Sequence, residues 1–131
     1  MVTEDYVSLE TAKLLNEKGF DCKKESITAM YREDGKFYSL SSSDPYYYDY
    51  NDFDEYDYIA PTLQTAMKWL REEHNLHIDP YPEDNDTWCL IIWELYPEHV
   101  KDCDGKYDDC SYSTYEEACE AAIKYCLENL I

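Results

Sequence analysis

The most apolar stretch of the chain runs from Trp88 to Tyr96 and is followed by Pro97. Side chains of a β-strand alternate between two faces, and here both alternating sets are apolar. One set is Trp88, Leu90 and Ile92, and the other is Cys89, Ile91, Trp93 and Leu95. A run this short, rich in β-branched and aromatic residues, predicts a central strand with helices covering both faces.

Three segments have apolar residues at helical spacing. The first spans residues 8–18, with Ser8 as N-cap and with Gly19 and Phe20 closing a Schellman motif. The second follows Thr62, ends near His74, and buries one stripe of side chains: Leu63, Ala66, Met67 and Leu70. The third begins with a capping box from Ser113 to Glu116 and continues through the alanine-rich C-terminal residues.

Two Asp-Gly pairs predict hairpin turns. Asp34-Gly35 as a two-residue loop places Tyr31 opposite Tyr38 and Glu33 opposite Lys36. Asp104-Gly105 as a second turn places His99 opposite Cys110. Residues 76–80 alternate like a strand, and Pro80 and Pro82 predict that this strand stops there and lies at a sheet edge.

These elements predict an α+β fold in which three helices pack on a mainly antiparallel sheet with residues 88–96 in its middle. A chain of 131 residues can bury its own core, so we expect residues 1–131 to form a single domain. No basic segment precedes an apolar one near Met1, and no run of 18 apolar residues occurs. We therefore expect a cytoplasmic protein with no membrane span.

The net charge of the chain limits the classes of partner that we expect it to bind. The chain has 30 acidic against 11 basic residues, a formal net charge of −19. Nucleic acids and anionic lipids are bound largely by basic side chains, so we expect no direct contact with either. A protein partner with a basic surface is the expectation that fits this charge.

Residues 44–58 form an acidic tract with six tyrosines, six acidic residues and no base. It has neither helical nor strand periodicity, and two interpretations stay open: a solvated surface loop, or a partner-binding segment. The second is attractive because tyrosine supplies contact area at low entropic cost. Its candidate binding residues are Tyr46, Tyr47, Tyr48, Asp49, Asp52, Asp54 and Asp57.

No motif for catalysis or metal binding is present. The six cysteines form no CxxC pair, and the expected cytoplasmic setting predicts free thiols rather than disulfides. His74, His77 and His99 form no HExxH motif, and all three glycines are assigned to turns or a helix end, which leaves no phosphate-binding loop. We expect no enzyme activity, no cofactor and no metal.

The chain resembles two groups of known proteins, and neither resemblance implies a mechanism. Residues 61–64, 68–78 and 114–118 resemble a family of small uncharacterised proteins common in gut Bacteroidales genomes, mobile elements and phages, which has no established activity. The likeness covers the three helices and implies a small cytosolic protein of a mobile element. From Thr62 onward, the helix–strands–helix order is similar to a double-stranded-RNA-binding domain, but Tyr115, Glu116 and Glu117 stand where such domains carry lysines.

Two hypotheses for function follow. The first is an acidic binding protein of a phage or mobile element that acts as an inhibitor or decoy of a host nucleic-acid enzyme or defence protein. The second is a small-ligand-binding or sequestering protein, with a homo-oligomer as one form, whose acidity only provides solvation.

Overall fold

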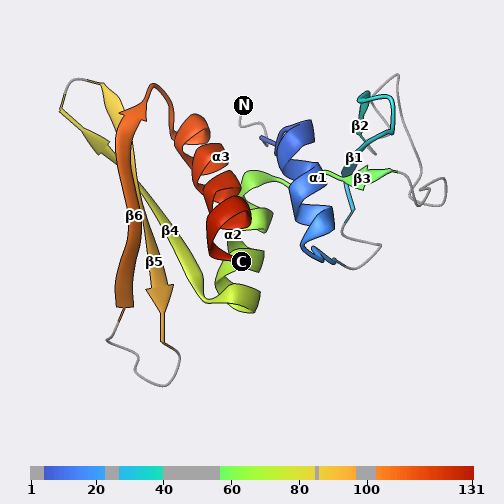
Figure 1. Ribbon diagram of the computed structural model, residues 1–131. Helices are drawn as coiled ribbons and strands as arrows, with labels where there is room; N and C mark the ends of the chain where they lie inside the picture. Colours follow the sequence, from blue (N-terminus) through green and yellow to red (C-terminus); the bar gives the residue numbers. More distant parts are fainter. Residues whose placement is uncertain (1–4, 23–26, 40–56, 85, 97–102) are drawn as a thin grey trace. The chain divides into compact units, whose positions relative to one another are not determined.

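The computed structural model describes residues 5–22, 27–39, 57–84, 86–96 and 103–131. Its helices and antiparallel strands confirm the α+β class, with the strands divided between two three-stranded sheets (Figure 1). The chain forms two compact units, residues 1–62 and residues 63–131, and each contains one of these sheets. The single domain expected for residues 1–131 stays a prediction.

The first unit contains α1 (Leu9–Glu17), β1 (Ala29–Tyr31), β2 (Phe37–Ser39) and β3 (Tyr58–Ile59), in the sheet order β2-β1-β3. Ser8 caps α1 by accepting a hydrogen bond from the Thr11 N–H at 3.2 Å. At its other end, Phe20 donates its N–H to the Leu15 carbonyl at 2.8 Å, and Gly19 has a φ of +86°. The predicted cap and Schellman ending are both confirmed.

The first hairpin differs from its prediction by one residue. Tyr31 pairs with Phe37 rather than Tyr38, and Arg32 donates its N–H to the Lys36 carbonyl at 2.9 Å. The loop therefore has three residues and ends at Gly35, whose φ is +87°. A tight turn followed by a left-handed glycine is the usual three-residue loop, so an Asp-Gly pair fits both loop lengths.

The second unit contains α2 (Leu63–His74), β4 (Leu76–Glu83), β5 (Thr87–Leu95), β6 (Cys103–Tyr112) and α3 (Tyr115–Tyr125), followed by the π-helical segment η3 (Cys126–Leu130). The sheet order β4-β5-β6 confirms the predicted central strand and edge strand. The buried stripe of α2 is also as predicted. Among the residues that the structure describes, no helix has the length and apolar composition needed to cross a membrane.

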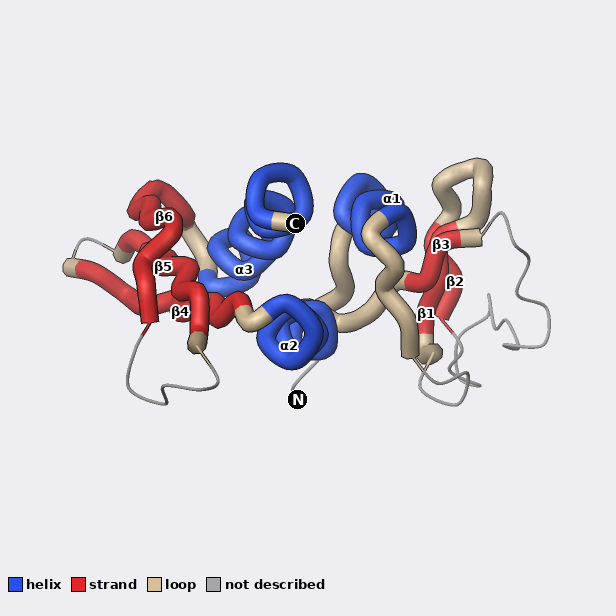
Figure 2. The backbone as a smooth tube through the Cα atoms, turned by 60° about the horizontal axis from the view of Figure 1, so that its bottom comes forward, coloured by secondary structure: helices blue, strands red, loops and turns tan. Residues whose placement is uncertain are grey.

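Both helices of this unit lie on the same face of its sheet (Figures 1 and 2). Leu90 and Ile92 of β5 lie on this face and are fully buried, as are Ala122 and Ile123 of α3. No described element of the unit covers the opposite face, where Ile91 remains partly exposed. Within this unit, the expectation of helices on both faces is not met, because α2 and α3 cover the same face.

The prolines do not stop β4, which continues to Glu83. Leu95 donates its N–H to the carbonyl of Asn75 at 2.7 Å. Because hydrogen-bonded pairs alternate along an antiparallel ladder, the backbone N–H and C=O groups of odd-numbered residues of β4 point toward β5. Pro80 and Pro82 are even-numbered, so their nitrogens face the free edge, where no N–H is needed.

Gly105 lies within β6 and pairs with Trp93, so the predicted turn at Asp104-Gly105 is wrong. The register shifts between Ile92 and Trp93, where Lys106 forms the extra residue of a bulge. A Cβ on Gly105 would lie 3.7 Å from Cζ3 of Trp93, so the indole packs over the bare glycine backbone. Trp93 and Gly105 are in contact in this way. His99, the expected partner of Cys110, lies outside the described residues.

The capping box of α3 is shifted by one residue from its prediction. Thr114 is the N-cap and accepts the Glu117 N–H at 3.1 Å. The Glu117 carboxylate in turn accepts the backbone N–H of Ser113 at 3.1 Å and its hydroxyl at 2.9 Å. Adjacent Ser and Thr, and adjacent Glu residues, allow the motif in either register.

Candidate functional site

The uncovered face of the β4-β5-β6 sheet, called here the open face, presents an apolar stripe bordered by polar residues. The pairing register places Ile91 between Asp79 and Asp108, and Trp93 between His77 and Gly105. Asp79 and Asp108 are exposed, whereas Ile91, Trp93 and Leu95 are partly buried. Lys106 lies at the bulge and forms an ion pair with Glu94 at 2.9 Å. The charged residues that the register places on this face are acidic: Asp79, Glu83 and Asp108.

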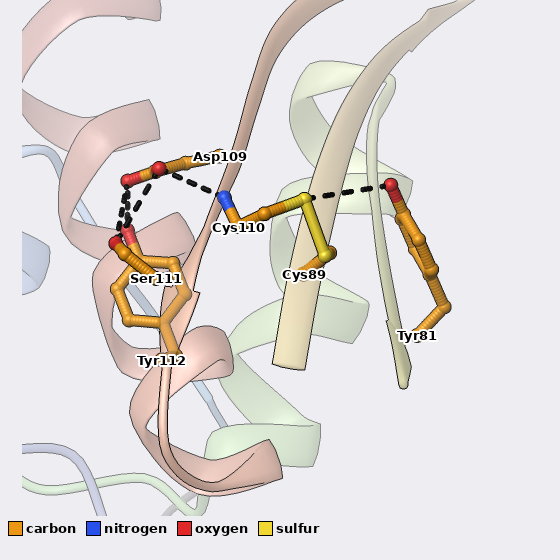
Figure 3. Close-up of a disulfide and its surroundings, with 6 residues drawn as sticks. All are labelled: Tyr81, Cys89, Asp109, Cys110, Ser111 and Tyr112. Carbon is orange, nitrogen blue, oxygen red and sulfur yellow. Dashed lines mark hydrogen bonds between the residues drawn. A yellow bond between two sulfur atoms is a disulfide. The ribbon is translucent and has the colours of Figure 1, made fainter. Parts of the chain in front are cut away.

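A disulfide joins Cys89 and Cys110 at one end of the open face (Figure 3). Their Cα atoms are 4.0 Å apart on neighbouring strands, at the second register shift between β5 and β6. Cys89 is fully buried, whereas Cys110 is exposed, and Tyr81 Oη lies 3.8 Å from Cys110 Sγ. The expectation of free thiols, which rested on the expected cytoplasmic setting, is wrong for this pair, because the β5-β6 register brings the two cysteines together.

Glu83 adds a carboxylate to the two sulfurs. One ligand atom from each of Glu83, Cys89 and Cys110 lies within 4.8 Å of the other two. Within the described ranges, this is the one group of three side chains with a metal-ligand arrangement. No sequence motif indicates it, because the three residues come from three strands and only the β-register brings them together.

Asp109 precedes Cys110 on β6 and accepts hydrogen bonds from residues of the same strand. Its carboxylate accepts hydrogen bonds from the Tyr112 hydroxyl at 2.9 Å and from the Cys110 backbone N–H at 2.8 Å (Figure 3). Burial, and then this hydrogen bond, raise the pKa of Tyr112 to about 12. Tyr107 stacks on Tyr125 of α3, with ring centroids 3.8 Å apart. These contacts hold this part of β6 against α3 and fix the backbone that carries Cys110.

The remaining cysteines divide into two types. Cys119 and Cys126 are fully buried in the core, and burial raises their pKa values to about 11 and about 12. They are therefore neutral, unreactive thiols at physiological pH. Cys103 is exposed and Cys22 is partly buried, and both are free thiols.

The candidate binding residues of the acidic tract are mostly outside the described residues; these are Tyr46, Tyr47, Tyr48, Asp49, Asp52 and Asp54. Asp57 is described and its side chain is only 6% exposed. A carboxylate this buried is placed to serve the first unit rather than a partner. Among the histidines, His74 packs edge-on against Trp69 at 4.7 Å, and His77 lies on the open face.

Comparison with known proteins found no matching protein family, no matching curated protein and no matching solved structure.

Proposed function

We propose that this chain is a non-catalytic binding protein for a basic protein, and that the open face is a contact surface. The observation that supports this is the row across the sheet in which exposed Asp79 and Asp108 stand on either side of Ile91. Such a row matches a partner surface with an apolar anchor between basic side chains.

The charge of the second unit extends this complementarity beyond one row. Residues 63–131 carry 16 acidic and 5 basic residues, a net charge of −11. An acidic field of this kind speeds association with a basic partner, while the desolvated apolar centre lengthens the bound state. Proteins that bind nucleic acid have basic grooves for phosphate, so an inhibitor or decoy of such a protein is the form of the proposal that the charge favours.

The acidic tract at residues 44–58 is a second contact surface within the same proposal. Its six carboxylates and six tyrosines are the composition of an acidic, aromatic segment that a basic partner could bind. Asp57 is left out of this surface because of its burial.

The test is partner capture on the immobilised full chain from a lysate of the cells that produce it, followed by mass spectrometry and by binding measurements with the purified partner. Asp79→Lys with Asp108→Lys reverses two charges on the open face. Glu72→Lys with Glu73→Lys reverses two exposed charges on α2, on the other side of the sheet, and is the matched control.

We expect a basic partner whose binding is lost in the open-face variant, kept in the α2 variant, and weakened steeply by salt. The screening length falls from about 10 Å at 0.1 M to about 3 Å at 1 M ionic strength, so a charge-led complex dissociates over this range. Asp49→Asn with Asp52→Asn and Asp54→Asn reports separately on the tract. A neutral or acidic partner, or equal binding by both double variants, would contradict the open-face proposal.

A further inference from the structure

We propose that, after reduction of the disulfide, Glu83, Cys89 and Cys110 bind a thiophilic divalent cation, with Zn²⁺ as the ion that fits best. The inference is independent of the proposed binding function. It rests on the position of three ligand-type side chains within 4.8 Å of one another at the end of the open face.

The geometry suits a tetrahedral ion. Zn²⁺ binds thiolate sulfur at about 2.3 Å and carboxylate oxygen at about 2.0–2.2 Å, so two sulfurs that share it lie roughly 3.8 Å apart. Once the Sγ–Sγ bond is broken, side-chain rotation alone can separate the sulfurs by this amount, because the Cα atoms are already 4.0 Å apart. Three protein ligands leave a fourth position for water.

The chemistry favours a soft metal over calcium or magnesium. Thiolates select zinc and similar ions, whereas hard cations require an all-oxygen set. Exposed Asp84 and Asp86 in the turn after Glu83 add negative charge close to the site. This charge favours a cation and disfavours an anionic ligand at the same position.

Metal binding and the disulfide exclude one another. A dithiol reductant transfers two electrons and two protons: the Sγ–Sγ bond breaks, Cys89 and Cys110 become thiols, and the reductant becomes its own disulfide. The cation then displaces both thiol protons, so its affinity rises with pH. The exposure of Cys110 gives the reductant access to the bond.

The other thiols supply matched controls. Cys103 is an exposed free thiol on the same strand as Cys110, but outside the group of three. Cys119 and Cys126 are buried in the core and also lie outside the group of three. A Cys110→Ser variant therefore removes a ligand from the site, and Cys103→Ser removes a comparable thiol that the site does not use.

The experiment uses the full chain, reduced with a dithiol and freed of reductant without oxygen. Zn²⁺ is titrated against a chromophoric chelator, and Co²⁺ is used to observe the sulfur-to-metal charge-transfer band. We expect one equivalent of Zn²⁺ and a thiolate–cobalt band for the reduced wild type and for Cys103→Ser. Glu83→Gln should bind about tenfold more weakly or worse, and Cys110→Ser should lose the band.

Circular dichroism of each reduced variant confirms that it is folded. Three results would overturn the site: no zinc bound by the reduced wild type, undiminished binding by Cys110→Ser, or equal binding by the oxidised and reduced forms.

Discussion

Neighbouring isoleucines of β5 provide a direct measurement of the one-sided packing of the second sheet. Ile92 is fully buried under the helices, whereas Ile91 lies on the open face and is partly exposed. We expect Ile92→Ala to destabilise the chain strongly and Ile91→Ala to have a small effect. The two substitutions remove the same atoms from the same strand, so their difference isolates the packing on each face.

The expected magnitudes follow from burial. Replacing a fully buried Ile with Ala loses transfer free energy and leaves a cavity, at a typical cost of 2–5 kcal/mol. At Ile91 no opposing layer encloses a cavity, so we expect a loss of about 1 kcal/mol from partial burial. The lower strand propensity of Ala contributes equally to both variants and cancels in the comparison.

Urea denaturation, followed by tryptophan fluorescence and circular dichroism, measures both variants. The midpoint gives the stability loss where the slope is unchanged, and equal slopes show that the two variants unfold the same surface. Losses of similar size at the two positions would refute one-sided packing, because they would show that Ile91 is enclosed as well as Ile92.

Three further outcomes are expected. Cys110→Ser should lower the free energy of unfolding of the oxidised protein by about 3 kcal/mol in urea denaturation, since the disulfide spans 21 residues, whereas Cys103→Ser should not. Asp109→Asn should lower the pKa of Tyr112 from about 12 in an ultraviolet titration; because the folded pKa lies above the unfolded value near 10, the stability from this group is complete below pH 10 and lost as pH rises through 12. Gly19→Ala should cost about 1 kcal/mol in thermal melting, because the φ of +86° strains any side chain; an unchanged melting temperature would contradict the left-handed assignment.

The parts of the fold predicted from sequence are those governed by local chemistry. Ser8 and Gly19 bound α1 because a hydroxyl accepts free N–H groups at one end and a left-handed residue closes the other. The stripe from Leu63 to Leu70 is buried because helical spacing alone puts these side chains on one face.

The strand register and the β-bulges could not be predicted from local sequence patterns. A single extra residue changes every pairing in a hairpin, and local turn preferences differ by less than the packing they compete with. Gly105 is the clearest example, since an Asp-Gly pair predicts a turn, whereas in the structure Gly105 lies within β6 and packs against the Trp93 indole, twelve residues earlier in the chain. The Cys89–Cys110 disulfide and the Glu83 group depend on the same register and were missed with it.

The open face follows from the number of helices available to the second unit. Three strands spaced by about 4.8 Å need a covering layer roughly 10–15 Å wide, which one helix of about 10 Å cannot supply but two adjacent helices can. Placing α2 and α3 side by side seals the face that carries Leu90 and Ile92. The central strand, apolar on both faces, does not indicate which one is sealed.

The edge strand β4 indicates which face of the sheet the helices cover. Along β4, Leu76 and Ile78 point to the helices and are buried, while His77 and Asp79 point to the open face. The acidic borders therefore belong to the face that the helices leave uncovered. Folding alone needs no row of Ile91 and Trp93 there, since polar side chains would serve an exposed face of an antiparallel sheet equally well. An apolar stripe kept between carboxylates is the pattern of a surface that another molecule covers, and it is the reason to test the open face for a basic partner first.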